Sequence, residues 1–302
     1  MQKTNNIPAI NNGSLLVLGG AILWGTNGTA QALGSPEAQP LVLGVLRILI
    51  GGLVLCLPAY IRSGTLPRFY PFASIFPAAI SAVLYQVTFF SAVKLTGVSI
   101  GTIVGIGSSP IFAGLVAWLI RKEKPSTKWY FATLAGVAGT VLVSLSSGMD
   151  NVVFSGVFLA LASGLSYAFL AVFMKNTFQK RKDTVTATGE IFLLGSLLML
   201  PFLFVYDLSW IKQADGTAII LYLGLITGAL AYYLFSKGLM KVSVATAGTL
   251  TLGEPLTAGI LGVVILGEEL STTGWMGIGL LLFGLLILTV PFRPIRQFIM
   301  QQ

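Results

Sequence analysis

Residues 41–61 read LVLGVLRILIGGLVLCLPAYI and contain one charged side chain, Arg47. A helix of about 20 apolar residues is long enough to cross the ~30 Å hydrocarbon core of a lipid bilayer. This stretch therefore predicts a transmembrane helix. Similar apolar stretches fill most of the chain.

The composition of the whole chain also indicates a membrane protein. Hydrophobic residues make up 55% of the 302 residues, charged residues make up 9%, and the mean hydropathy is +0.88. Soluble domains carry charge on about a quarter of their residues, whereas a surface that faces lipid needs no charge. The net charge of +8 lies in short loops beside apolar stretches, so acidic lipid headgroups explain it better than nucleic acid does.

The residue types that are missing exclude several kinds of chemistry. The sequence has no histidine, so His-based metal sites, proton relays and catalytic triads are excluded, and we predict no metal site and no catalytic residue. Cys56 is the single cysteine, and within an apolar stretch it is expected to pack rather than react. No segment resembles a phosphate-binding Walker loop, so we expect neither ATP use nor a cofactor.

We expect a single transmembrane domain over residues 1–302, with ten membrane-spanning helices. The polar N-terminus lacks the basic start, short apolar core and cleavage site of a signal peptide, so its first apolar stretch counts as a span. The expected spans are residues 13–33, 41–61, 72–93, 98–120, 130–146, 153–174, 187–206, 218–239, 244–266 and 274–290.

The basic residues predict how these helices are oriented. All 18 Lys and Arg residues except Lys94, Lys212 and Arg47 lie in the terminal tails, in the loops that follow even-numbered spans or, for Lys237, at the end of such a span. Cytoplasmic loops hold the excess of Lys and Arg in membrane proteins. Both termini are therefore predicted to be cytoplasmic, as an even number of spans also requires, in a multi-pass protein of the cytoplasmic membrane.

The sequence repeats itself at an interval of about 145 residues. The first copy contains Val98, Ser99, Thr102, Pro110, Gly114 and Glu123, and the second contains Val242, Ser243, Thr246, Pro255, Gly259 and Glu268. These copies divide the chain into halves at 13–147 and 153–290. Five spans in each half is an odd number, so the halves would insert in opposite directions. Inverted repeats are typical of secondary transporters, whose substrate site lies between the halves near the bilayer midplane.

The motifs of both halves resemble the drug/metabolite transporter superfamily, specifically its EamA-type transporters. The resemblance rests on Arg47 in the second span, on GEPLTA at 253–258 and on LGEEL at 266–270, together with the arrangement of two times five spans. It implies an all-α integral membrane protein made of two EamA repeats. It also implies a carrier of the inner membrane, many of whose relatives export amino acids or other metabolites.

Three ionisable side chains fall within the expected spans, where an ion costs at least ~2.5 kcal/mol. Glu254 is the deepest, and it could bind a cationic group or carry a proton, or it could fix a helix kink. Arg47 could pair with an acid or bond to helix-end carbonyls. Glu190 lies near a span end, where snorkelling to the interface is the simpler explanation. Glu123 and Glu268 lie just beyond span ends, where a packing or topology role is expected.

Prolines and glycines are expected to shape the helices. Pro110 and Pro255 each remove a helix hydrogen bond and occupy equivalent places in the two halves, so a paired hinge and a static bend are both open. The 35 glycines exceed what the loops require, and we expect them to mark close contacts between helices.

Aromatic and polar side chains at membrane depth are the other candidates for a binding site. Tyr and Trp usually collect at the membrane interfaces, and a buried Tyr needs a hydrogen-bond partner. We predict a central cavity, with ordinary helix packing as the alternative for each residue alone. The predicted substrate-binding residues are Trp24, Asn27, Tyr85, Gln86, Phe89, Tyr167, Tyr232, Tyr233 and Glu254, with Phe90, Thr26, Thr88, Ser91, Ser108 and Ser109 nearby.

These features predict a non-enzymatic transporter that moves a small-molecule substrate by alternating access. The family resemblance favours export of amino acids or related amphipathic solutes, by facilitated diffusion or by proton antiport with Glu254 and Arg47 as the charged groups. An organic cation such as a quaternary amine is the alternative substrate. A channel and a membrane-embedded enzyme are remote alternatives. We expect a monomer surrounded by lipid, because one chain carries both halves of the site.

Overall fold

The computed structural model describes the chain apart from residues 1–11, 65–68, 70, 146–152, 182 and 291–302, and the described residues form helices and no strand. The first half contains α1 (Asn12–Gly25), α2 (Asn27–Leu33), α3 (Pro40–Ser63), α4 (Phe72–Arg121) and α5 (Thr127–Leu145). The second half contains α6 (Phe154–Lys180), α7 (Thr184–Leu203), the 3-10 helix η1 (Ser209–Lys212), α8 (Ala214–Tyr222), the π-helix η2 (Leu223–Leu230), α9 (Ala231–Leu239), α10 (Val244–Leu250), α11 (Gly253–Val264) and α12 (Thr272–Thr289).

Eight helical stretches within the described residues are long and apolar enough to cross a membrane. They are Pro40–Ser63, Phe72–Thr96, Val104–Arg121, Phe154–Lys180, Thr184–Leu203, Ala214–Leu239, Val244–Val264 and Thr272–Thr289. They coincide with expected spans two to four and six to ten. The first expected span falls on α1 and α2, and the fifth falls on α5. The all-helical membrane fold is thus confirmed, whereas the number of ten spans stays a prediction.

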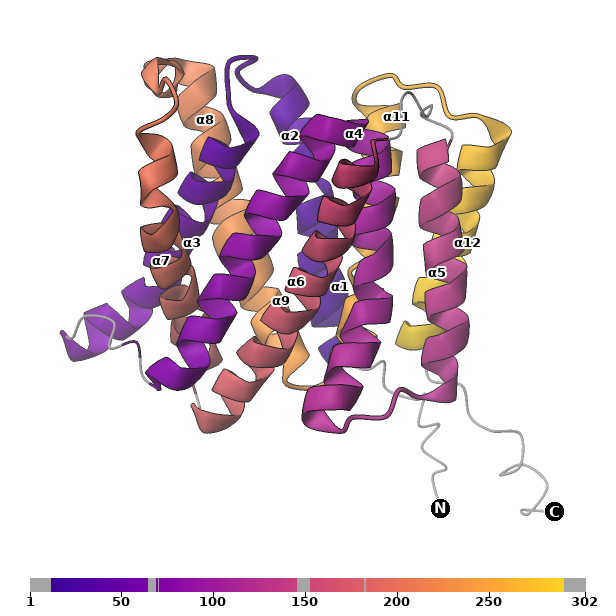
Figure 1. The fold of residues 1–302 in the computed structure, drawn as a ribbon, viewed down its shortest axis with the longest axis horizontal. Helices are drawn as coiled ribbons and strands as arrows, with labels where there is room; N and C mark the ends of the chain where they lie inside the picture. The colour runs from indigo at the N-terminus through magenta and orange to yellow at the C-terminus, as the bar shows by residue number, and fades with distance from the viewer. Residues whose placement is uncertain (1–11, 65–68, 70, 146–152, 182, 291–302) are drawn as a thin grey trace, which may run out of the picture.

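The long helix α4 contains two of these spans because the chain turns back within it. A Cβ atom placed on Gly101 would lie 3.1 Å from the Cα atom of Val93. A straight α-helix separates residues eight apart by about 12 Å. Figure 1 shows the ribbon of α4 rising across the view and then returning toward the start of α5. Glycine allows this close approach, because any larger side chain would meet the Val93 backbone.

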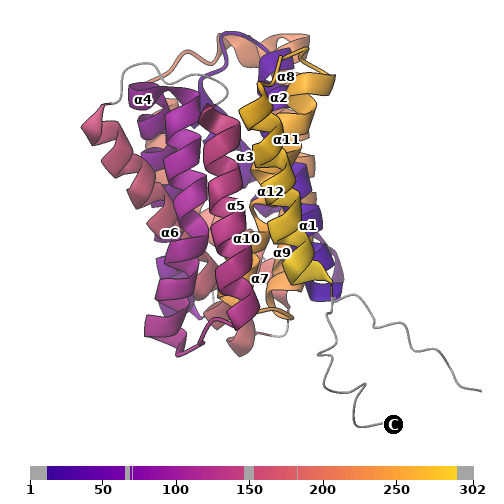
Figure 2. The ribbon, with the colours of Figure 1, turned by 90° about the vertical axis from the view of Figure 1, so that its right-hand side faces the viewer.

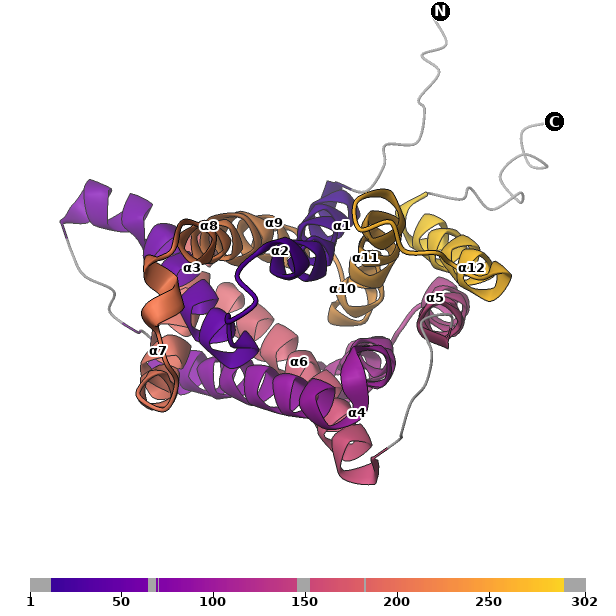
Figure 3. The ribbon, with the colours of Figure 1, turned by 90° about the horizontal axis from the view of Figure 1, so that it is seen from above.

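The helices form a bundle with two sides that face each other. Seen from above, α4 and α6 run along one side, and α8, α9, α1 and α11 run along the other (Figure 3). The short helix α10 lies between the sides and packs against α1, α4, α5 and α6. Helices α5 and α12 form a pair at one end of the bundle, which Figure 2 views from that end. Segments from both halves of the chain therefore meet in the interior.

Glycine pairs allow several of these helices to pack backbone to backbone. A Cβ atom on Gly51 of α3 would lie 2.8 Å from the carbonyl carbon of Gly228 in η2. A Cβ atom on Gly139 of α5 would lie 2.7 Å from the carbonyl oxygen of Gly277 in α12. Lipid supplies no hydrophobic drive for helix association, so close packing of small residues holds such helices together.

The regular α-helical pattern is interrupted at three places in the interior. A turn at Thr26 separates α1 from α2, a turn at Thr251 and Leu252 separates α10 from α11, and η2 is a π-helix between α8 and α9. At membrane depth, irregular backbone is tolerated only where protein buries it or where it lines a cavity. Single π-turns are also frequent at functional sites. The space that these interruptions enclose is therefore a candidate functional site.

The two equivalent prolines lie in different local structures. Pro255 lies in the first turn of α11, where a missing backbone N–H leaves no helical bond unmade. Pro110 lies inside α4, and the helix continues through it. The interruption next to Pro255 therefore has no counterpart at Pro110. A hinge at either proline stays a prediction.

Candidate functional site

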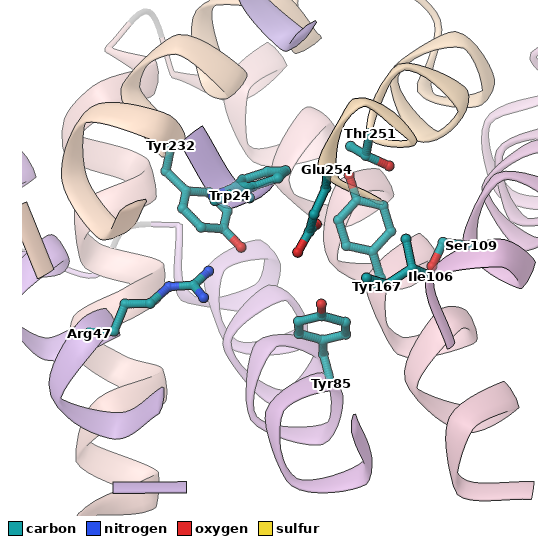
Figure 4. A pocket seen from close by; sticks show the side chains of 9 residues that line it. All are labelled: Trp24, Arg47, Tyr85, Ile106, Ser109, Tyr167, Tyr232, Thr251 and Glu254. Carbon is teal, nitrogen blue, oxygen red and sulfur yellow. The ribbon is translucent and has the colours of Figure 1, made fainter. Parts of the chain in front are cut away.

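A small, partly open cavity of about 30 Å³ lies where the interrupted helices meet. Small-molecule sites typically combine apolar and aromatic walls with a few convergent polar groups. The polar ends of Arg47, Tyr85, Tyr232 and Glu254 point toward one common space (Figure 4). The side chains that line the cavity are Trp24, Arg47, Tyr85, Ile106, Ser109, Tyr167, Tyr232, Thr251 and Glu254.

Trp24 connects the break after α1 to the π-helix. Its indole Nε1–H donates a hydrogen bond of 3.1 Å to the carbonyl oxygen of Thr227 in η2. The Trp24 ring also packs against Tyr232 and Phe235 of α9, with ring centres 4.6 Å and 5.2 Å away. Because Trp24 is only 4% exposed, this contact fixes the wall of the cavity rather than covering its mouth.

Arg47 reaches the cavity from α3, and the residue is half-buried. The carbon of its guanidinium lies 5.9 Å from the centre of the Tyr232 ring, within the range of a cation–π contact. The Nε atom of Arg47 is buried and has no hydrogen-bond partner. A buried donor without a partner is costly, so a ligand with an acceptor group would stabilise this side chain.

Glu254 enters from the first turn of α11, and its carboxylate points into the cavity (Figure 4). Among the ion pairs of the described residues, none joins Glu254 to Arg47. The cavity therefore presents one cation and one acid that do not neutralise each other by direct contact. Tyr85 and Tyr167 lie beside them with ring centres 6.0 Å apart. The buried hydroxyl of Tyr167 points toward Thr251, away from these charged groups (Figure 4).

Six of the predicted site residues line this cavity, and four do not. Those that line it are Trp24, Arg47, Tyr85, Tyr167, Tyr232 and Glu254. Successive residues of a helix differ by about 100° in direction, so Tyr233 faces away from Tyr232. Tyr233 is 42% exposed and lies beside Lys237 instead. This geometry corrects the expectation that both tyrosines face the same interior.

The other three residues outside the cavity lie near it. Gln86 is buried against Gly44 of α3, next to the cavity wall. Phe89 stacks on Tyr85 with ring centres 5.8 Å apart, so it supports a lining residue from behind. Asn27 begins α2, and its backbone oxygen accepts a hydrogen bond from Gln31. Substrate contact by any of these residues stays a prediction.

The structure adds Ile106 and Thr251 to the lining, and it places Ser109 there as well. Ile106 and Ser109 are three residues apart in α4, so they share one helix face. Thr251 precedes Glu254 by three residues at the break between α10 and α11. The one sequence signal that could have found Thr251 is this spacing, because an isolated Thr in an apolar span otherwise resembles a packing residue.

The EamA-like transporter family matches the chain twice, at residues 11–145 and at residues 154–290. The chain belongs to the EamA-like transporter family. Its membership is consistent with the drug/metabolite transporter superfamily that the sequence motifs resemble. This EamA protein is therefore a multi-pass membrane transporter, and family membership points away from an enzyme.

Two bacterial relatives of this EamA protein extend over nearly the same length. YwfM of Bacillus subtilis strain 168, described as an uncharacterized transporter, is 40% identical over 280 residues, which cover 93% of this chain and 94% of that protein. YicL of Salmonella typhimurium strain LT2, described as an uncharacterized inner membrane transporter, is 24% identical over 294 residues, covering 93% and 96% of the two chains. A solved crystal structure with 19% identity has the same fold, with a TM-score of 0.80 over 93% of this chain and 97% of the other.

A second polar cluster surrounds Glu123, which follows the end of α4 and lies outside the membrane spans. Glu123 accepts a hydrogen bond of 2.8 Å from Nε of Arg121 and lies 3.4 Å from Nζ of Lys175. Its other carboxylate oxygen accepts a 3.2 Å bond from the backbone N–H of Val244. Burial raises the pKa of Glu123, but these hydrogen bonds from Arg121 and Val244 outweigh it and hold the pKa below its ordinary value.

A third cluster lies at the beginning of α7. Glu190 is only 1% exposed and pairs with Arg181. Asp183 caps α7 by accepting bonds from the backbone N–H groups of Val185 and Thr186, at 3.1 Å and 3.2 Å. Burial opposes the charge of Asp183, yet the hydrogen bonds from Thr186 lower its pKa. Paired acids at a helix start have an ordinary structural role, so this cluster does not compete with the cavity as the transport site.

Proposed function

We propose that this EamA protein is a secondary transporter that moves small metabolites across the cytoplasmic membrane by alternating access. Ten spans in two inverted halves, 13–147 and 153–290, would rock around the central cavity, with both termini in the cytoplasm. The leading substrates are amino acids or related amphipathic solutes, moved outward. The family's two matches along the chain and the repeated sequence motifs support two related halves.

The observation that carries this proposal is the set of charges in the cavity. Arg47 and Glu254 enter from opposite halves of the chain and form no direct ion pair. Tyr85, Tyr167 and Tyr232 supply aromatic surface around them. A solute that carries both an acid and an amine on an apolar body would satisfy all these groups at once. Discontinuous helices that meet at such a site are a common construction in secondary transporters.

Proton coupling through Glu254 is our leading mechanism, and facilitated diffusion is the alternative. A carboxylate can couple a proton flux to an opposite solute flux only if the proton and the solute compete for that carboxylate. Glu254 faces the cavity within the membrane and lies in the first turn after a break in the helix. Acids at such depth commonly mark proton or substrate pathways.

An organic cation is the second candidate substrate, and the aromatic walls favour it. Cations bind over aromatic faces with about 0.5–2 kcal/mol per contact. Arg47 argues against this substrate, because its guanidinium already lies over the Tyr232 ring. A cation would therefore need Glu254 to outweigh repulsion from Arg47.

The experiment that tests the proposed function begins with a thermal-shift screen of the purified protein. Amino acids, amines, nucleobases and sugars would be compared at equal concentration, because a ligand that binds the native state raises the unfolding temperature. Each hit would then be tested for counterflow in liposomes. We expect a zwitterionic amphipathic solute to stabilise the protein and to show accelerated exchange. Flux without counterflow would indicate a channel and contradict a carrier.

A further inference from the structure

The fourth and ninth predicted spans, which are equivalent in the two halves of the chain, end with the same left-handed turn. Lys122 and Gly267, which are equivalent in the repeat, both have left-handed backbone, with φ of 58° and 69°. Lys122 adopts this conformation although it is not glycine, which costs roughly 1 kcal/mol. The repeat therefore preserves the turn in the first half despite an unfavourable residue.

Each turn places a glutamate in the same backbone position. The N–H of Glu123 donates to the carbonyl oxygen of Ala117 at 3.3 Å, and the N–H of Glu268 donates to that of Gly262 at 3.0 Å. The end of α4 and the loop after α11 lie at opposite ends of the bundle (Figure 1). Equivalent acids therefore stand at the two membrane faces, which we call the Glu123 face and the Glu268 face. The charge pattern predicts that the Glu123 face is cytoplasmic.

At the Glu123 face, the carboxylate joins three separate helices. It binds Arg121 at the end of α4, Lys175 in the last turns of α6 and the first N–H of α10. Lys175 also donates a 2.6 Å hydrogen bond to the carbonyl oxygen of Val242, just before α10. The side chains of Arg121 and Lys175 are only 8% and 10% exposed, so water does not screen these contacts well.

At the Glu268 face, the equivalent acid is differently placed. Glu268 is exposed, lies in the loop after α11 and is close to Gly262 of that helix. Of the ion pairs found among the described residues, none includes Glu268. The same turn and the same acid thus have a dense set of partners at one face and solvent at the other. Two equivalent groups in one protein can differ in this way when its conformation is closed at one membrane face and not at the other.

The Glu123 contacts act on the element that carries the cavity wall. They hold the beginning of α10, and α10 leads directly to Thr251 and Glu254 at the cavity. Gly248 in the middle of α10 also packs closely on Ala113 of α4. Movement of α10 away from α4 and α6 would therefore need the Glu123 contacts to break.

We propose that Glu123, Arg121 and Lys175 form a latch that closes the cavity at the Glu123 face, and that Glu268 is the counterpart that engages when the cavity closes at the other face. This inference rests on the alternating access of the proposed function. In the conformation described, the latch is engaged and α10 is held against α4 and α6. Opening toward the Glu123 face requires its release.

Cysteine accessibility tests this latch without any knowledge of the substrate. Cys56 would be replaced by Ser, which leaves a chain without cysteine, and Ser109→Cys would report access to the cavity. A membrane-impermeant thiol reagent would be applied from each face separately. Glu123→Gln removes a charge-assisted contact, so we expect labelling from the Glu123 face to rise about tenfold relative to labelling from the Glu268 face.

Two further variants keep the test decisive. Lys175→Gln removes another member of the latch and should shift accessibility in the same direction, even if Glu123→Gln folds poorly. Glu269→Gln removes an exposed acid next to Glu268 and should change nothing. If Glu123→Gln and Lys175→Gln lower the unfolding temperature but leave the ratio of labelling between the faces unchanged, the cluster is only structural and the latch is wrong.

The role of Glu268 has a separate readout. Glu268→Gln should shift labelling in the opposite direction from Glu123→Gln, because it weakens closure at the Glu268 face. Equal effects of Glu268→Gln and Glu269→Gln would overturn the paired role. A failure of counterflow with every solute would contradict the proposed function instead, so the two failures can be told apart.

Discussion

The guanidinium of Arg47 on α3 lies 5.9 Å from the centre of the Tyr232 ring on α9, so the second predicted span of one half meets a span of the other half at the cavity. The backbones of these segments also touch, since a Cβ atom on Gly228 would lie 2.7 Å from the carbonyl oxygen of Arg47. The unusual π-helix η2 thus packs directly behind the charged residue. Arg47 is consequently held in place by backbone contact while its Nε remains without a partner.

Replacing Arg47 separates the two candidate substrate classes. For an amphipathic solute with a carboxylate, Arg47→Gln should weaken binding about tenfold or more, because a charge-assisted hydrogen bond contributes about 1.5–3 kcal/mol. Arg47→Lys should recover part of that loss. Titration calorimetry with a hit from the thermal-shift screen measures both. An unchanged or tighter dissociation constant in Arg47→Gln would favour an organic cation.

Replacing Glu254 tests proton coupling. In Glu254→Gln, a pH gradient should no longer drive solute flux into liposomes, whereas counterflow at equal pH should continue. Glu269→Gln is the matched control, since Glu269 is an exposed acid outside the helices. Proton-driven flux that survives in Glu254→Gln would exclude this residue as the coupling group.

Glycine packing between α3 and η2 predicts a specific loss of stability. In Gly51→Ala, the new methyl group would lie 2.8 Å from the carbonyl carbon of Gly228, which is backbone and cannot rotate away. We expect a loss of about 1–3 kcal/mol from overpacking, seen as a lower unfolding temperature in detergent. Gly279→Ala in α12 is the control, because no atom lies within 4 Å of its new methyl group. A similar loss in both variants would show that the close contact is unimportant.

The pKa of Glu123 predicts how its contribution depends on pH. Because hydrogen bonds from Arg121 and Val244 outweigh burial and lower this pKa in the folded state, ionised Glu123 stabilises the fold above its unfolded pKa of about 4.3. That stability is lost as the pH falls through the lower folded value. Wild type should therefore unfold at a higher temperature than Glu123→Gln at pH 7, and the difference should shrink below about pH 4. A difference that stays constant down to pH 3 would contradict the stabilising role.

Sequence patterns predicted the helical membrane fold because apolar stretches of about 20 residues have few other stable arrangements. They also selected Arg47 and Glu254, which line the cavity, as candidate site residues, because charged side chains at membrane depth are rare. The breaks at Thr26 and Thr251 could not be located in the same way, because the residues beside them, Gly25, Gly253 and Pro255, are types that continuous transmembrane helices also tolerate, as α4 tolerates Pro110. The π-helix η2 contains no proline. The position of Tyr233 has a different cause, because adjacent residues of a regular helix such as α9 differ by about 100° in direction and cannot both face the cavity.

The measurement that tests the cavity most directly compares two neighbouring tyrosines in counterflow. Tyr232 is 5% exposed and lines the cavity, whereas Tyr233 is 42% exposed and faces away. With a solute identified by the thermal-shift screen, Tyr232→Ala should slow counterflow by about tenfold or more, which corresponds to about 1.4 kcal/mol. Tyr233→Ala should exchange at nearly the wild-type rate. Equal rates in the two variants, or a greater loss in Tyr233→Ala, would contradict transport through this cavity.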